Sequence, residues 1–114
     1  MIVVADSSPL IAFAILNLLE ILAKIFDELY VPQAVYDEVT SWNKPYAREL
    51  QDFLKNRVKT VENKLAVTIL TNELDIGESE AIILALENNI SDILIDEPKG
   101  RKIEENLESF SDRR

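Results

Sequence analysis

The chain contains no cysteine and no histidine, and each absence excludes whole classes of functional site. Without cysteine there can be no disulfide framework and no thiolate metal site, and a reducing compartment is no obstacle. Without histidine there is no Ser-His-Asp triad, no imidazole base and no His-ligated metal. Only two glycines occur, Gly77 and Gly100, so neither a P-loop nor a dinucleotide-binding fingerprint can be formed. Carboxylate, hydroxyl, Lys and Arg chemistry remains.

Long apolar stretches are also absent. The longest, from Pro9 to Leu16, ends at Asn17, whereas a membrane span needs about 20 apolar residues, and we expect no membrane segment. The first residues include no basic region and carry Asp6 where a signal peptide would be apolar, which predicts a cytoplasmic protein. With 114 residues, 47% of them apolar, we expect a single domain over residues 1–114.

The net charge of −9 argues against a protein that binds nucleic acid by bulk electrostatic attraction, because such domains usually carry a basic face. A function on RNA would have to overcome this repulsion. Bound divalent cations could cancel part of the charge locally, or a second copy or a partner could supply a basic surface.

Short apolar runs alternate with helical patterns along the chain. Strands are predicted at residues 2–5, 28–31 and 93–95, with a weaker edge strand at 57–61. Helices are predicted at 9–25 with a break near Asn17, and at 32–39, 46–55, 78–87 and 98–107, while residues 62–70 fit either state. This alternation predicts an α/β fold, a three-layer α/β/α sandwich with a central parallel sheet.

Acidic residues occur where such a fold would bring them together. Asp6 and the pair Asp96-Glu97 directly follow predicted strands, and parallel strands bind ligands beyond their carboxyl ends. Glu38 lies on the helix after the second strand, and Glu78 and Glu80 lie at the start of a later one. Converging carboxylates would make an oxygen site suited to Mg²⁺ or Mn²⁺. Such an ion can activate water and hydrolyse a phosphodiester without histidine.

The same carboxylates need a cation if they converge. Two of them about 5 Å apart repel by roughly 3 kcal/mol at an effective dielectric of about 20. Each acid also has a structural interpretation: Asp6 or the pair Asp96-Glu97 could cap a helix, and Glu38 could face solvent. These alternatives stay open from the residues alone.

Glu78 and Glu80 cannot both face one site, because two residues on a helix are separated by about 200°. Asp75 and Glu78 have the spacing of a capping box, which gives Glu78 a structural role. We therefore predict that Glu80 is the functional residue, and Glu78 is the alternative candidate.

Three further residues are candidates for binding the substrate. Ser7 could bind a phosphate or a metal-bridged water through its hydroxyl and its N–H at a helix N-terminus, although a capping role is equally consistent. Lys99 and Arg101 belong to a basic cluster just after the last acidic pair and could contact RNA phosphates. A solvent-facing helix surface is the alternative for part of this cluster.

The motifs together resemble the PIN-domain family. They are Asp-Ser-Ser-Pro-Leu-Ile-Ala at 6–12, Val-Pro at 31–32 with Glu38-Val39, Gly-Glu-Ser-Glu-Ala-Ile at 77–82, and Ile-Leu-Ile-Asp-Glu at 93–97 with Gly100-Arg101. The resemblance covers about residues 1–103, leaving a polar tail at 104–114. It is greatest to prokaryotic predicted nucleic-acid-binding members related to VapC-type toxins.

This resemblance implies a Mg²⁺- or Mn²⁺-dependent ribonuclease, commonly dimeric and often neutralised by a cognate antitoxin. It places Asp6, Glu38, Glu80 and Asp96 or Glu97 at the four acidic positions of the family. The chain departs from the family in having Asp-Glu where Asp-Asp is usual, and in ending where related chains continue. We expect a second copy to cover the exposed sheet edge, docking through Ile103, Leu107 and Phe110.

Two other functions stay open. An inactive or truncated PIN-like module could bind nucleic acid or assemble with partners without cutting RNA. A phosphate-handling enzyme of the haloacid dehalogenase or receiver type also places an Asp after its first strand. It is disfavoured because the first type needs an Asp where this chain has Ser8, and the second needs a paired acid that no neighbouring segment supplies.

Overall fold

A parallel sheet forms the centre of the molecule. The computed structural model describes residues 1–41 and 43–95, and within them the strands run in the order β3-β2-β1-β4. Their bounds are β1 Ile2–Ala5, β2 Glu28–Pro32, β3 Val58–Lys59 and β4 Asp92–Leu94. All three pairings are parallel. The predicted parallel sheet, with its weak edge strand β3, is confirmed.

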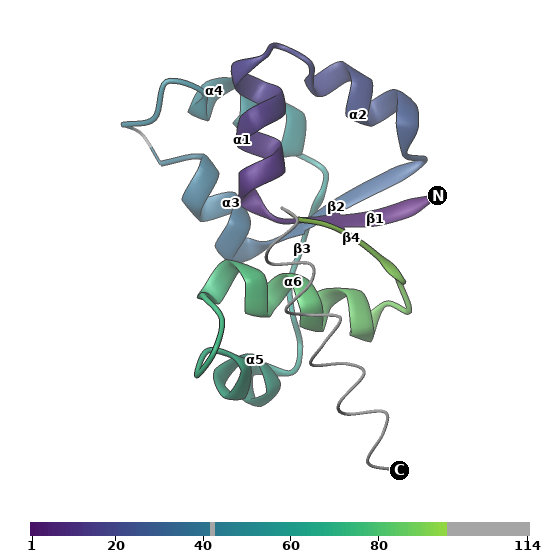
Figure 1. Cartoon of the computed structure of the whole chain (residues 1–114), viewed down its shortest axis with the longest axis vertical. Coiled ribbons are helices and arrows are strands. Elements are labelled where there is room, and N and C mark those ends of the chain that lie inside the picture. Colours follow the sequence, from purple (N-terminus) through teal and green to yellow (C-terminus); the bar gives the residue numbers. More distant parts are fainter. Residues whose placement is uncertain (42, 96–114) are drawn as a thin grey trace.

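Helices cover both faces of this sheet (Figure 1). Their bounds are α1 Ser7–Ile15, α2 Leu19–Ile25, α3 Gln33–Val39, α4 Ala47–Leu54, α5 Lys64–Leu70 and α6 Ile76–Glu87. The helices α1 to α4 lie on one side, and α5 and α6 lie on the other. This confirms the three-layer α/β/α sandwich. None of these helices in the described part of the chain is long and apolar enough to cross a membrane.

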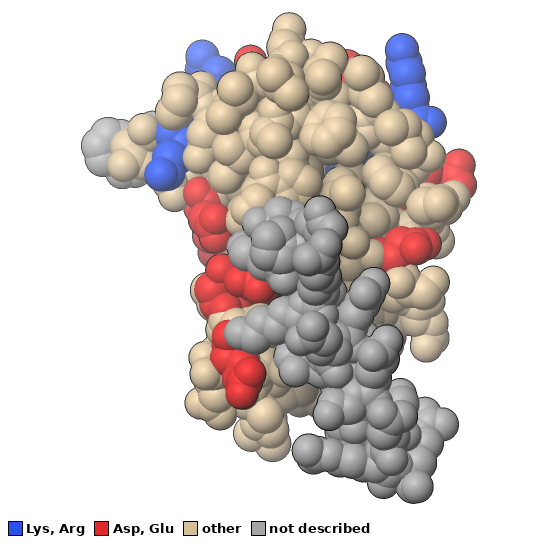
Figure 2. Space-filling view, in the orientation of Figure 1, with Lys and Arg blue, Asp and Glu red and all other residues tan. Residues whose placement is uncertain are grey.

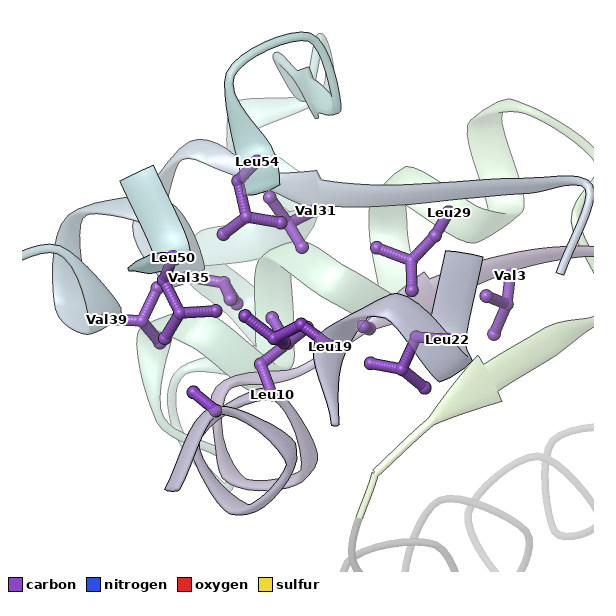
Figure 3. Close-up of a cluster of buried hydrophobic side chains, with 12 residues drawn as sticks. Val3, Leu10, Leu19, Leu22, Leu29, Val31, Val35, Val39, Leu50 and Leu54 are labelled. Carbon is purple, nitrogen blue, oxygen red and sulfur yellow. The ribbon is translucent and has the colours of Figure 1, made fainter. Parts of the chain in front are cut away.

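The sheet is apolar on both faces because alternate strand residues point to opposite layers. On β1, Val3 and Ala5 pack with α1 to α4, whereas Val4 packs with α5 and α6. The larger core, shown in Figure 3, joins the strands to residues such as Leu10, Leu22, Leu50 and Leu54. Burial on both faces holds the end of β1, and therefore Asp6, in a fixed position.

The observed helix boundaries correct the predictions in three places. α1 starts at Ser7 with Asp6 as its N-cap, two residues before the expected start at Pro9. α6 starts at Ile76, two residues before Glu78. The ambiguous stretch 62–70 forms α5, whose N-cap Asn63 accepts a hydrogen bond from the Ala66 N–H at 3.0 Å. The helix predicted at 98–107 and the docking residues Ile103, Leu107 and Phe110 lie outside the described residues.

An asparagine in the left-handed conformation follows the C-terminus of both α1 and α6, at a position where glycine is usual. Asn17 has φ 60° and Asn89 has φ 55°. In each case the next residue closes a Schellman motif, with Leu18 N–H donating to Phe13 C=O and Ile90 N–H donating to Ala85 C=O, both at 2.8 Å. Asparagine tolerates this conformation better than other side chains with a Cβ.

Substitutions at Asn89 should show how much this conformation matters. Asn89→Ala should lower the free energy of unfolding by about 1 kcal/mol, because an alanine is strained at positive φ. Asn89→Gly should stay within about 0.5 kcal/mol of the wild type, because glycine adopts this conformation freely. Urea unfolding of the three proteins measures the difference, and equal stability of the two variants would contradict the assignment.

Candidate functional site

Asp6 is a buried carboxylate at the carboxyl end of β1. Its side chain is only 1% exposed, and Oδ1 accepts a hydrogen bond from the Ser7 N–H at 2.8 Å. Its own N–H donates to the Leu94 C=O at 2.9 Å, which joins it to the end of β4. The structural interpretation of Asp6 as a helix cap is therefore correct. A cap alone does not need burial, however, and burying a carboxylate is costly without compensating groups.

Gly77, in the first turn of α6, lies beside this carboxylate. A Cβ placed on Gly77 would lie 3.5 Å from Asp6 Oδ1, 3.5 Å from Asp75 Oδ1 and 3.5 Å from Val35 Cγ2. The side of Gly77 that lacks a Cβ thus faces the end of β1 and helix α3 together. The start of α6 therefore lies directly against the Asp6 carboxylate.

Glu80 makes a direct contact between two helices. Its Oε1 accepts a hydrogen bond from the Ala34 N–H, in the first turn of α3, at 3.0 Å. Glu78 lies in the first turn of α6 and is only 7% exposed, and its N–H donates to Asp75 Oδ1 at 2.8 Å. The N-cap role predicted for Asp75 is confirmed. Glu80 is thus held against α3, whereas the backbone of Glu78 is bound within its own helix.

Glu38 is exposed and lies on α3, four residues after Ala34. Within residues 1–41 and 43–95, no three acidic side chains are close enough together to hold a metal ion. The structure therefore brings Asp6, the start of α6 and the start of α3 together without forming a closed metal cage. Asp96 and Glu97 lie outside the described residues.

The candidate substrate-binding residues are only partly described. Ser7 is buried, and its N–H donates to Asp6 Oδ1 at 2.8 Å. Lys99 and Arg101 lie outside the described residues. Ser79 Oγ, between the two α6 acids, is buried and has no hydrogen-bond partner among the residues described.

The electrostatic setting combines acidic side chains with helix N-termini. Figure 1 shows the starts of α1, α3 and α6 near one another at the edge where β1 and β2 end. Figure 2 shows acidic side chains along the left of the same face, at the height of α3 and the start of α6. The positive ends of the α1 and α6 dipoles partly offset this negative charge and favour bound anions. These helix N-termini therefore reduce the repulsion between the carboxylates at this edge of the sheet.

Sequence reasoning missed the contacts of Gly77 and Ala34. Gly77 belonged to a recognised motif, but its closeness to Asp6 depends on how α6 meets β1. A signal for the Ala34 contact does exist in the sequence. Pro32 precedes α3 and has no side-chain oxygen, so the first N–H groups of this helix need an acceptor from elsewhere.

Comparison with known proteins identifies the family. A family model described as PIN domain matches residues 2–109, which is nearly the whole chain and extends beyond the predicted limit at residue 103. No curated protein matches the chain. No solved structure matches it. The family match and the parallel three-layer fold agree, and the chain belongs to the PIN-domain family.

Proposed function

We propose that this chain is a metal-dependent endoribonuclease that hydrolyses phosphodiester bonds of single-stranded RNA with Mg²⁺ or Mn²⁺. PIN domains are in general nucleases that use divalent metal ions. The single observation that carries the proposal here is the Asp6 carboxylate, which is buried at the carboxyl end of β1 and lies beside Gly77 at the start of α6. A carboxylate oxygen is a ligand that Mg²⁺ and Mn²⁺ prefer.

The proposed metal ligands come from the ends of two strands and the starts of two helices. They are Asp6, Glu38, Glu80 with Glu78 in reserve, and Asp96 or Glu97. β4 ends beside Asp6, since the Leu94 C=O accepts the Asp6 N–H, and Asp96 follows Leu94 by two residues in the sequence. This short separation supports a shared site for Asp6 and the last acidic pair.

The donor set fits a hard divalent cation. Every proposed ligand is a carboxylate, and the chain has no histidine or cysteine that would favour a softer metal. When bound, the ion would supply an activated water and stabilise the charge on the leaving oxygen. The chain itself would hold the phosphate near the starts of α1 and α6, with the Ser7 hydroxyl, Lys99 and Arg101 as candidate contacts.

The biological setting is also part of this proposal. A net charge of −9 disfavours RNA binding by the isolated, metal-free chain, so a second copy or a basic partner would assist. We propose a cytoplasmic homodimer acting as the toxin of a VapBC-like pair, with a cognate antitoxin as its partner. The support is the sequence resemblance to VapC-related proteins.

Thermal unfolding with and without Mn²⁺ tests the metal site independently of catalysis. Mn²⁺ at about 100 times its dissociation constant should stabilise the folded chain by about 2.7 kcal/mol, which raises the melting temperature by about 10 °C. Asp6→Asn should abolish most of this increase, because the buried anionic ligand is lost. A wild-type melting temperature that does not respond to Mn²⁺ would contradict the proposal.

A second candidate function is a catalytically inactive PIN-like module that binds nucleic acid or assembles with partners. One observation favours it: within the described residues no three acids are close enough to hold a metal. The same titration separates the two candidates. An inactive module would fold normally, show no Mn²⁺-dependent stabilisation and leave RNA uncut.

A further inference from the structure

Helix α3 begins without a cap of its own. Pro32 occupies its N-cap position and makes no side-chain hydrogen bond to the helix. The first N–H groups of any helix lack intrahelical acceptors, and leaving one unpaired in a partly buried place is costly. The Ala34 N–H, in the first turn, therefore depends on an acceptor from another part of the chain.

Glu80 of α6 provides that acceptor across 46 residues of sequence. Its Oε1 lies 3.0 Å from the Ala34 nitrogen, in a partly buried setting. The bond is charge-assisted, and the negative carboxylate lies at the positive end of the α3 dipole. One side chain thus ties the start of α3 to α6.

The same side chain lies on the face of α6 that looks toward Asp6. Gly77 and Glu80 are three residues apart and so differ by about 60° around the helix, whereas Gly77 and Glu78 differ by about 100°. Helical side chains also lean toward the N-terminus, over the preceding turn. Glu80 therefore leans toward Gly77, where an added Cβ would lie 3.5 Å from Asp6 Oδ1.

We infer that Glu80 has two linked roles: one carboxylate oxygen caps α3 through the Ala34 N–H, and the other is presented to the metal. The hydrogen bond from the Ala34 N–H uses Oε1, so Oε2 is the oxygen that a metal would take. Metal-binding carboxylates are commonly oriented by a further hydrogen bond, and the Ala34 N–H is that group here. The inference rests on the proposed function for its metal-binding half only.

The link also positions Glu38. Ala34 and Glu38 are four residues apart and lie on one face of α3. Fixing the first turn of α3 against α6 therefore fixes where Glu38 stands relative to Asp6. Ala34 acts only through its backbone and is a positioning residue.

Variants of Glu80 separate the two roles. Glu80→Gln keeps an oxygen that accepts the Ala34 N–H, so its melting temperature in EDTA should stay within about 2 °C of the wild type, whereas its Mn²⁺ affinity should fall at least about 10-fold. Glu80→Ala should lose both the cap of α3 and the Mn²⁺ affinity. Its melting temperature in EDTA should be about 5 °C lower, and solvent exchange of the Ala34 amide, measured by NMR, should be faster.

Glu87 offers a matched control on the same helix. Its carboxylate accepts the N–H groups of Glu62 at 3.0 Å and Asn63 at 2.6 Å, before the start of α5. Glu87→Ala should also lower the melting temperature, but it should change neither the Ala34 amide exchange nor the Mn²⁺ affinity.

Each half of the inference can fail separately. An unchanged Ala34 amide in Glu80→Ala would overturn the capping role. Full Mn²⁺ affinity in Glu80→Gln, or its loss in Glu78→Gln instead, would overturn the assignment of Glu80 as the metal-facing acid. If wild type itself does not bind Mn²⁺, the proposed function fails, and the amide exchange and melting temperatures in EDTA still decide the capping role.

Discussion

Asp6→Asn is expected to lower the rate of metal-dependent RNA cleavage by at least about 100-fold, equivalent to about 3 kcal/mol in the activation barrier. The substitution removes the negative charge that would bind the cation. It keeps an oxygen that can accept the Ser7 N–H, so the cap of α1 is retained and the fold should stay within about 1 kcal/mol of wild-type stability. Initial cleavage rates at saturating Mn²⁺ measure the effect.

The control for this variant is Glu49→Gln. Glu49 is an exposed acid on α4 and is not a proposed ligand, so its loss should leave the cleavage rate unchanged. The comparison separates the loss of a specific ligand from the general loss of one negative charge. An Asp6→Asn protein that cuts RNA nearly as fast as wild type would remove Asp6 from the site.

Leu84→Ala is expected to produce the largest loss of stability, about 3 kcal/mol. Leu84 is 0% exposed and belongs to the core between the sheet and helices α5 and α6, so truncation removes buried contacts and leaves a cavity. For a domain whose total stability is about 5–15 kcal/mol, this is a large fraction. The melting temperature should fall by about 10 °C.

Leu86, two residues further along α6, is the matched control because it is 60% exposed. Leu86→Ala should change the free energy of unfolding by no more than about 0.5 kcal/mol. Thermal or urea unfolding of both variants makes the comparison. Equal losses for the two leucines would show that α6 is not packed as described.

Most of the fold was predictable because its signals are local. The apolar run 2–5, the break near Asn17 and the Asp75 cap each depend on neighbouring residues, and each is found in the structure. The segment that became α5 was not predictable, because its sequence Lys-Leu-Ala-Val-Thr-Ile-Leu mixes good helix formers with β-branched residues. Its packing against α6 decided its state.

The positions of the candidate residues along the fold were more predictable than their contacts. That Asp6 follows β1 could be derived from a strand ending in an acid at the sheet edge. The hydrogen bond from the Ala34 N–H to Glu80 could not be derived from the sequence. It joins residues 46 positions apart and depends on how α3 and α6 pack together. The capping role of Asp6 is observed, because it caps α1, and its proposed functional role would be a second one for the same buried carboxylate.

The acidic character of the chain, which first argued against an RNA-binding protein, becomes consistent with the proposed site. Asp6 precedes α1, and Glu78 and Glu80 lie in the first two turns of α6, so part of the negative charge lies near helix N-termini, whose dipoles offset it. The proposed activity therefore requires a metal ion. Without a divalent ion, the site would repel the phosphates that it is proposed to cut.

The most direct test of this account is cleavage of a fluorescent single-stranded RNA by the wild-type chain in Mn²⁺, in Mg²⁺ and in excess EDTA. The account predicts cutting with Mn²⁺ or Mg²⁺, none in EDTA, and recovery when the metal is restored. Intact RNA in all conditions, while a known ribonuclease cuts the same substrate, would contradict the proposed activity, and equal cutting in EDTA would contradict its dependence on metal.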